Sequence, residues 1–191
     1  MFKKDEIVLL MALPSESQKL FERAGVEVFY SGIGKVNAAM LATDLIHRKK
    51  PKTLINLGTA GSQKFVTHTL VECSGYVQRD MDLSPLGFPH GETPMDKIPG
   101  LIKSNRLVGG NVSGICGTGD SFEVGPSKVP CDLVDMEAYA IAKVCKKFET
   151  EFVSFKYISD GSDHNAHNDW VANLTPASIK LFEIYSYLVK V

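Results

Sequence analysis

The most constraining feature of this sequence is the alternation of short apolar runs with helix-forming stretches. The apolar runs have the length and composition of buried strands and lie at 6–12, 26–32, 53–58, 68–77, 107–116 and 151–159. Stretches that favour helices lie at 35–50, at 135–148 and from Thr175 to the C-terminus. Strands that alternate with helices form βα units and a largely parallel sheet, so the sequence predicts an α/β fold.

The helix boundaries follow from the residues at their ends. The helix at 35–50 is rich in Ala and Leu and stops before Pro51, and the one at 135–148 ends in cationic residues that suit a helix C-terminus. For the last helix the sequence predicts Thr175 as N-cap and Pro176 at the first helical position. Its spaced apolar residues should face the sheet; they are Ile179, Phe182, Tyr185 and Leu188 or Val189.

Length and composition limit the class of protein. A chain of 191 residues with 44% hydrophobic content fits a single domain over residues 1–191, and a domain of that size buries roughly 70% of its unfolded surface. The net charge is -1 and the basic residues are scattered, which argues against nucleic acid as a partner. The first apolar run is too short to span a membrane and is followed by Pro14, so we expect a cytoplasmic protein.

Cysteine and histidine spacing favours neither a disulfide scaffold nor a metal site. The four cysteines show no CxxC spacing and are expected to be reduced thiols in the core. His164 and His167 lie three residues apart, but no third ligand has a persuasive spacing, so we expect no metal. The long irregular segment 78–106 is expected to be functional, an interface or mobile.

Several polar or glycine-rich signals follow the apolar runs, where an open α/β sheet binds its ligands. They are Glu16, the turn at Gly32 and Gly34, "NLGTAGS" (56–62), "GTGDSF" (117–122), "DME" (135–137) and Asp160. Taken singly, each has a plainer explanation as a surface acid, a βα turn, a core phenylalanine or an acid at a helix start. The glycine pair is not a full dinucleotide fingerprint, because Asn37 occupies the third glycine position.

Taken together, these motifs are a far more specific sign of function than any one of them alone. "GIGKVNAA", "NLGTAGS", "GTGDSF", "VDMEAYAIAKVC" and "ISD" occur in the order and at about the spacing of the nucleoside phosphorylase/nucleosidase superfamily. The sequence resembles most closely the 5′-methylthioadenosine/S-adenosylhomocysteine nucleosidases, over nearly the whole chain, with the 78–106 region shortened. This resemblance implies a three-layer nucleoside phosphorylase-like fold, in which helices flank a central mixed, largely parallel sheet. It also implies cleavage of the bond between a purine and ribose C1′ through an oxocarbenium-like transition state, without a cofactor.

The resemblance assigns roles to particular residues. Asp160 would protonate N7 of the departing purine, and Gly161 would let the chain turn away from the base. Glu16 would orient and deprotonate the attacking water, while Glu137 would hold the ribose hydroxyls. The remaining substrate contacts are assigned to Met136 on the sugar, Phe122 stacking on the purine, the backbone of Glu123 at the purine edge, and Thr59, Ala60, Gly61 and Ser159 around them.

Some positions depart from the family pattern. Phosphorolytic members carry an arginine where this chain has Asn56, so hydrolysis is favoured over phosphorolysis. Lys156 stands where an arginine near the ribose and water is usual, which keeps the charge but loses the planar fork. In the family that the sequence resembles, the pocket for the 5′ group is apolar and is partly donated by a second subunit, so the resemblance implies a homodimer. Leu13 suits that pocket, and Leu86 could supply the partner's part of its wall.

The sequence leaves other questions open. The 5′ group could be methylthio, homocysteinyl, a plain hydroxyl or a futalosine-like extension. The pathway served also stays open, with methionine salvage as the one that the resemblance suggests. The alternatives to a hydrolase are a phosphorylase, a nucleoside-binding module without turnover, and an α/β domain whose acids are all surface charges.

Overall fold

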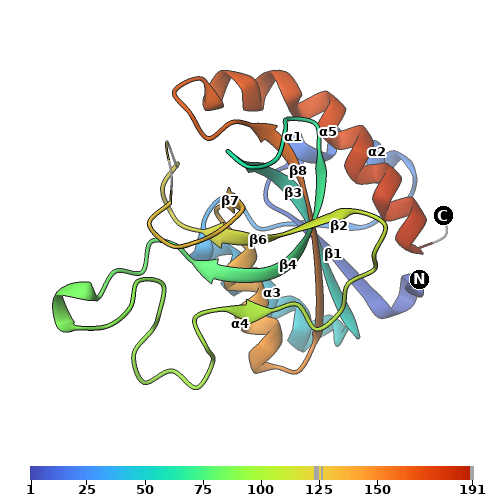
Figure 1. The fold of residues 1–191 in the computed structure, drawn as a ribbon. Helices are drawn as coiled ribbons and strands as arrows, with labels where there is room; N and C mark the ends of the chain where they lie inside the picture. The colour runs from blue at the N-terminus through green and yellow to red at the C-terminus, as the bar shows by residue number, and fades with distance from the viewer. Residues whose placement is uncertain (123–124, 126, 190–191) are drawn as a thin grey trace.

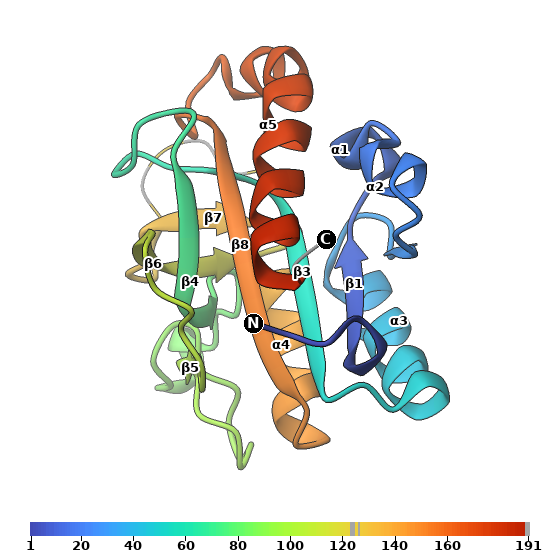
Figure 2. The ribbon, with the colours of Figure 1, turned by 90° about the vertical axis from the view of Figure 1, so that its right-hand side faces the viewer.

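A twisted eight-stranded sheet lies between two layers of helices (Figures 1 and 2). The structure is a computed structural model and describes residues 1–122, 125 and 127–189. The strands are β1 (Ile7–Met11), β2 (Val28–Tyr30), β3 (Thr53–Gly61), β4 (Leu70–Gln78), β5 (Ile102–Lys103), β6 (Val112–Thr118), β7 (Leu133–Asp135) and β8 (Glu151–Asp160). The helices are η1 (Lys4–Glu6), α1 (Pro14–Ser17), α2 (Leu20–Arg23), α3 (Lys35–Lys49), η2 (Ser84–Leu86), α4 (Ala138–Lys147) and α5 (Ala166–Val189).

The sheet is mixed and largely parallel, which confirms the predicted architecture. Its strand order is β2-β1-β3-β7-β6-β4-β5, and β8 pairs with both β3 and β4. Strand β8 runs parallel to β3 along its whole length and antiparallel to β4, while β7 pairs with β3 only at its end, Gly61 with Val134. Strands β3, β8, β4, β6 and β7 therefore form a closed ring. As a result, the ends of β3, β7 and β8 meet in one place.

Two hydrophobic cores lie on the two faces of this sheet. On β3, Leu54 packs with α3 and α4, whereas its neighbour Ile55 packs on the opposite face with α5. Both side chains are fully buried, and burial of such a side chain contributes roughly 1.5–3 kcal/mol. Because neighbouring residues point to opposite faces, a continuous apolar run such as 53–58 is the pattern of a strand covered on both sides.

Two strands escaped prediction because they are very short, and one began later than predicted. Strands β5 and β7 have two and three residues. The run predicted at 107–116 becomes a strand only at Val112, because Gly109 and Gly110 adopt left-handed backbone with φ of 81° and 85°.

The start of the last helix was predicted wrongly. Helix α5 begins at Ala166, so Thr175 is not its N-cap and Pro176 lies inside the helix. Two side chains hold the early turns on the sheet: Trp170 Nε1 donates to Thr59 Oγ1 at 3.0 Å, and Asn173 Nδ2 donates to the Ser159 carbonyl at 2.8 Å. These tertiary contacts override the local cap signal. The helix also turns Ile179 partly outward, leaving its side chain 48% exposed.

Within the described part of the chain, no helix has both the length and the apolar character needed to cross a membrane.

Candidate active site

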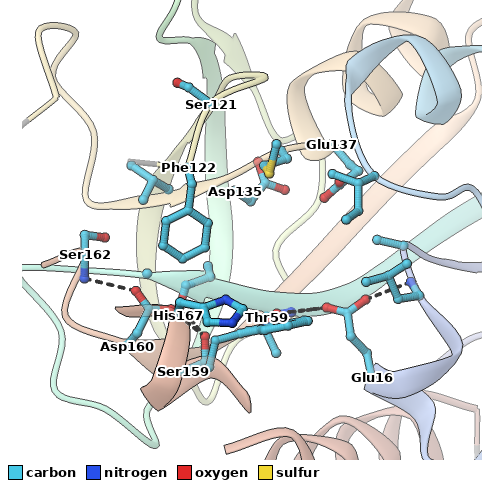
Figure 3. A pocket seen from close by; sticks show the side chains of 18 of the residues that line it. Glu16, Thr59, Ser121, Phe122, Asp135, Glu137, Ser159, Asp160, Ser162 and His167 are labelled. Carbon is cyan, nitrogen blue, oxygen red and sulfur yellow. Dashed lines mark hydrogen bonds between the residues drawn. The ribbon is translucent and has the colours of Figure 1, made fainter. Parts of the chain in front are cut away.

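A cavity of about 280 Å³ opens where the ends of β3, β7 and β8 meet (Figure 3). The residues after β1, the segment that follows β6 and the start of α5 complete its wall. Ten of the predicted site residues line it: Leu13, Glu16, Thr59, Ala60, Gly61, Phe122, Met136, Glu137, Ser159 and Asp160. The structure thus brings together side chains from distant parts of the sequence.

Glu16 is held by three donors at one side of the cavity. It lies in the short helix α1, where Pro14 suits the first helical position, and is only 4% exposed. Its Oε1 accepts from Thr59 N at 2.8 Å and from Thr59 Oγ1 at 2.9 Å, and its Oε2 accepts from Leu13 N at 3.1 Å. Such a buried, hydrogen-bonded carboxylate is oriented before any ligand arrives.

Asp160 ends β8 on the other side of the cavity (Figure 3). Ser159 Oγ donates to its Oδ2 at 2.8 Å and Ser162 N donates to its Oδ1 at 3.0 Å. Burial raises the pKa of Asp160 despite these two bonds, which oppose the shift, and the nearby carboxylates of Asp169 and Asp163 raise it further. A raised pKa is what a carboxyl group needs to keep a proton for donation near neutral pH.

Glycine is required at position 61, beside this carboxylate. A Cβ on Gly61 would lie 2.5 Å from Asp160 Oδ1 and 2.3 Å from Ser162 Oγ. The turn after Asp160 differs from the expectation: Ser162, with φ of 51°, adopts the left-handed backbone, and Gly161 does not. The chain turns at the serine because its N–H then reaches Asp160.

Glu137 lies just before α4, at the N-cap position. Its Oε1 accepts from Gly34 N at 2.9 Å, and Gly34 has a φ of 97° that favours glycine. Burial raises the pKa of Glu137 to about 8, and the neighbouring charge of Asp135 adds to this shift, while Lys156 opposes it. This shift favours the protonated form of Glu137 near neutral pH.

Lys156 does not line the cavity but lies beneath its floor. It is 1% exposed, and its Nζ forms an ion pair with Asp135 Oδ2 at 2.8 Å. Burial by itself would lower the pKa of Lys156, but Asp135 and Glu137 raise it above its usual range, so the lysine stays charged. A Cβ on Gly58 would lie 3.4 Å from Lys156 Nζ and 3.1 Å from Glu16 Oε1, so the buried cation is a close neighbour of Glu16.

The structure places the predicted residues Phe122, Leu86 and Glu123 in three different ways. Phe122 is 54% exposed, and Figure 3 shows its ring directed toward the space between Asp160 and Glu16. Leu86 lies in η2, is 71% exposed and takes no part in the cavity of its own chain. Glu123 lies outside the described residues. No group of three or more potential metal ligands occurs in the part of the chain that the structure describes.

Other residues in the wall were not predicted, among them Ile33, Arg79, Ser121, Asp135, His167 and Trp170. Arg79 follows β4 and donates to Ser121 Oγ at 3.1 Å, to the Ser121 carbonyl, and to the Gly119 carbonyl at 3.4 Å. It therefore fixes the segment that carries Phe122. No local pattern marks Arg79, although it falls in the irregular segment 78–106.

Asn56 does not reach the cavity. Its Nδ2 donates to the Leu10 carbonyl at 3.1 Å, and its Oδ1 accepts from Ser154 Oγ at 3.1 Å. The side chain that replaces the phosphorolytic arginine is therefore used inside the sheet.

Comparison with known proteins agrees with this fold. The family model described as "Phosphorylase superfamily" matches residues 19–190. Among solved structures, a 5′-methylthioadenosine/S-adenosylhomocysteine nucleosidase from Helicobacter pylori with butyl-thio-DADMe-Immucillin-A superposes with a TM-score of 0.85, at 23% identity over 95% of this chain and 96% of that one. The native futalosine hydrolase of the same organism superposes with a TM-score of 0.82, at 24% identity over 93% and 95%. The fold is thus that of a phosphorylase-superfamily enzyme.

Proteins that are similar in sequence indicate which family within the phosphorylase superfamily the chain belongs to. The chain is 32% identical to the 5′-methylthioadenosine/S-adenosylhomocysteine nucleosidase of Bacillus subtilis, over 89% of this chain and 83% of that protein. It is 31% identical to the nucleosidase of the same name from Anoxybacillus flavithermus, over 87% and 81%. The chain belongs to the phosphorylase superfamily and, within it, to the family of these nucleosidases.

Proposed function

We propose that this protein hydrolyses the N-glycosidic bond of 5′-methylthioadenosine and S-adenosylhomocysteine and releases adenine. The observation that carries the proposal is one small cavity with Asp160 on one side and Glu16 and Glu137 on the other (Figure 3). The similarity to nucleosidases above 30% identity supports it.

In this proposal the two buried carboxyl groups divide the proton transfers. As the bond between C1′ and the purine N9 breaks, protonated Asp160 donates its proton to N7, and the base leaves neutral. Water attacks C1′ from the other side of the sugar, and Glu16 accepts the proton that the water loses. Asp160 ends ionised and Glu16 ends protonated, and proton exchange with solvent, gain by Asp160 and loss by Glu16, restores the starting state for the next turnover. Both groups act on charge that develops only in the transition state.

The remaining contacts bind the substrate. Phe122 stacks on the purine, Met136 packs on the sugar, and Glu137 binds the ribose hydroxyls. The backbone of Glu123, outside the described residues, is assigned to the purine edge. The positive charge of Lys156 acts from beneath the floor rather than by direct contact, and it offsets the like charges of the acids around the ribose.

The cavity also bears on the 5′ substituent. At about 280 Å³ it lies just below the range for small-molecule sites, roughly 300–1,000 Å³. This size favours a short group such as methylthio, with Leu13 against it, and a longer chain would pass through the mouth of the cavity.

A homodimer in the cytoplasm completes the proposal. Ile33, just before α3, is 50% exposed and also lines the cavity, and Val36 and Met40, in the first two turns of α3, are 69% and 67% exposed. Exposed apolar side chains beside a ligand site suit a subunit interface. Leu86 is equally available to a partner's cavity. Light scattering coupled to size exclusion should give twice the chain mass.

The direct test is adenine release from 5′-methylthioadenosine in phosphate-free buffer. An Asp160→Asn variant should lose on the order of 10²-fold in kcat while it still folds and binds. Adenine that appears only after phosphate is added would replace hydrolysis by phosphorolysis. Nucleoside binding without any product would favour the non-catalytic binding module.

A further inference from the structure

The side chain of Trp170 reaches the cavity from α5 and connects to Glu16 through one intermediate residue. Trp170 is the only tryptophan in the chain. Its Nε1 donates to Thr59 Oγ1 at 3.0 Å, and Thr59 Oγ1 donates to Glu16 Oε1 at 2.9 Å. Three side chains from separate parts of the sequence thus form a continuous hydrogen-bonded chain.

The chemistry of the three groups determines the direction of this chain. An indole N–H only donates, so Thr59 cannot give its hydroxyl proton to Trp170. With Trp170 occupying an acceptor position on Thr59 Oγ1, the single hydroxyl proton is directed to Glu16. Without the indole, that hydroxyl is free to rotate toward other acceptors, including water.

The arrangement also leaves one oxygen of Glu16 available. Oε1 accepts two bonds, from Thr59 N and Thr59 Oγ1. Among the described residues, Oε2 accepts only from Leu13 N, and a carboxylate oxygen has room for about two donors. Trp170 and Thr59 therefore hold the carboxylate in the orientation that leaves Oε2 with room for a further donor.

Asn173 provides the second anchor of this part of α5 and a matched control. Its Nδ2 donates to the Ser159 carbonyl at 2.8 Å, one helical turn after Trp170. It holds the same helix on the sheet but has no contact with Thr59 or Glu16 in any described hydrogen bond. Loss of Asn173 removes one bond between α5 and the sheet and leaves the two bonds of the Trp170–Thr59–Glu16 chain in place.

We propose that Trp170 is a positioning residue for the reaction, acting on Glu16 through the hydroxyl of Thr59. This inference rests on the proposed function, because it assumes that Glu16 orients the water. Trp170 thereby links the early turns of α5, which cover the cavity, to the group that activates the nucleophile.

A double-mutant cycle tests the proposal. Trp170→Phe keeps an aromatic ring and removes the N–H, and Thr59→Val removes the hydroxyl while the Thr59 backbone N–H bond to Glu16 stays. Each single variant should lower kcat for 5′-methylthioadenosine by about tenfold, the upper range for one hydrogen bond, with KM changed about twofold or less. The double variant should be no slower than Thr59→Val alone, because both changes break the same chain. Thr59→Val combined with Asn173→Ala should instead show additive effects.

Tryptophan emission gives a second readout that needs no change at Trp170. Because the chain has a single tryptophan, all indole emission comes from this site. Thr59→Val should shift that emission in ligand-free protein, whereas Asn173→Ala should leave it nearly unchanged.

The outcomes separate this inference from the proposed function. An additive Trp170/Thr59 cycle, an effect confined to KM, or unchanged emission in Thr59→Val would overturn the positioning role while the nucleosidase activity stands. A wild-type protein that folds but releases no adenine would overturn both.

Discussion

The substitution Gly61→Ala tests whether Asp160 must occupy the position that the structure gives it. The new Cβ would lie 2.5 Å from Asp160 Oδ1, whereas real Cβ contacts stay above about 3.0 Å and are comfortable from 3.4 Å. The carboxylate must therefore move by 0.5 Å (3.0 − 2.5) at least and by 0.9 Å (3.4 − 2.5) for an ordinary contact. Ser162 Oγ, at 2.3 Å, must move farther still.

A shift of this size is large for a catalytic group, since displacement by about 1 Å can cost on the order of 10²-fold in rate. We expect kcat for adenine release from 5′-methylthioadenosine to fall by roughly that factor, close to the loss in Asp160→Asn. Chromatographic measurement of adenine gives the rate, and thermal melting shows whether the variant is folded.

Gly161→Ala is the matched control. Gly161 also adjoins Asp160, but its added Cβ meets only the Asp163 carboxylate, at 3.2 Å, and its backbone is not left-handed. We expect its rate to change about twofold or less, as for an ordinary surface substitution. A folded Gly61→Ala protein with the same rate as Gly161→Ala would refute the assignment of Asp160 as a rigidly held acid.

Other consequences of the geometry can be checked in the same way. Glu137→Gln should flatten the dependence of Tm on pH between about 4.5 and 8. In the folded protein the pKa of Glu137 is about 8, against an ordinary pKa of 4.5. The contribution of Glu137 to stability is therefore complete below pH 4.5 and is lost as the pH rises through 8. Equal slopes of Tm against pH in wild type and variant would contradict this pKa. Lys156→Met should lower the free energy of unfolding by about 3–5 kcal/mol in urea titrations, because it leaves Asp135 buried without its cation, and a loss below about 1 kcal/mol would mean that Asp135 finds another partner. Arg79→Met should raise KM more than it lowers kcat, since it frees the segment that carries Phe122 without touching either catalytic carboxylate; a selective loss of kcat would place Arg79 in the chemical step instead.

The sequence was a reliable guide where local pattern and burial agree. The runs that became β1, β3, β4 and β8 are apolar enough to be covered on both faces, and helix α3 ends one residue from its predicted limit. Ten residues of the cavity wall were also predicted, because they lie in short motifs directly after strands and the resemblance assigned each motif a role.

The sequence could not predict the role of a residue whose partners lie far away along the chain. Lys156 looks like a strand residue next to the site, and only the pairing of β8 with β3 turns its ammonium group under the floor and toward Asp135. Arg79 belongs to an irregular segment, and its partners lie about forty residues further along the chain.

By itself, the sequence determined the α/β layering, the positions of the main strands along the chain and the set of acids available for the chemistry, because these depend on local periodicity and on residue identity. The tertiary structure decided the start of α5, the chain of bonds from Trp170 to Glu16, and the raised pKa values of Asp160 and Glu137. These depend on desolvation and on contacts between residues that are tens of positions apart, and no local pattern encodes them.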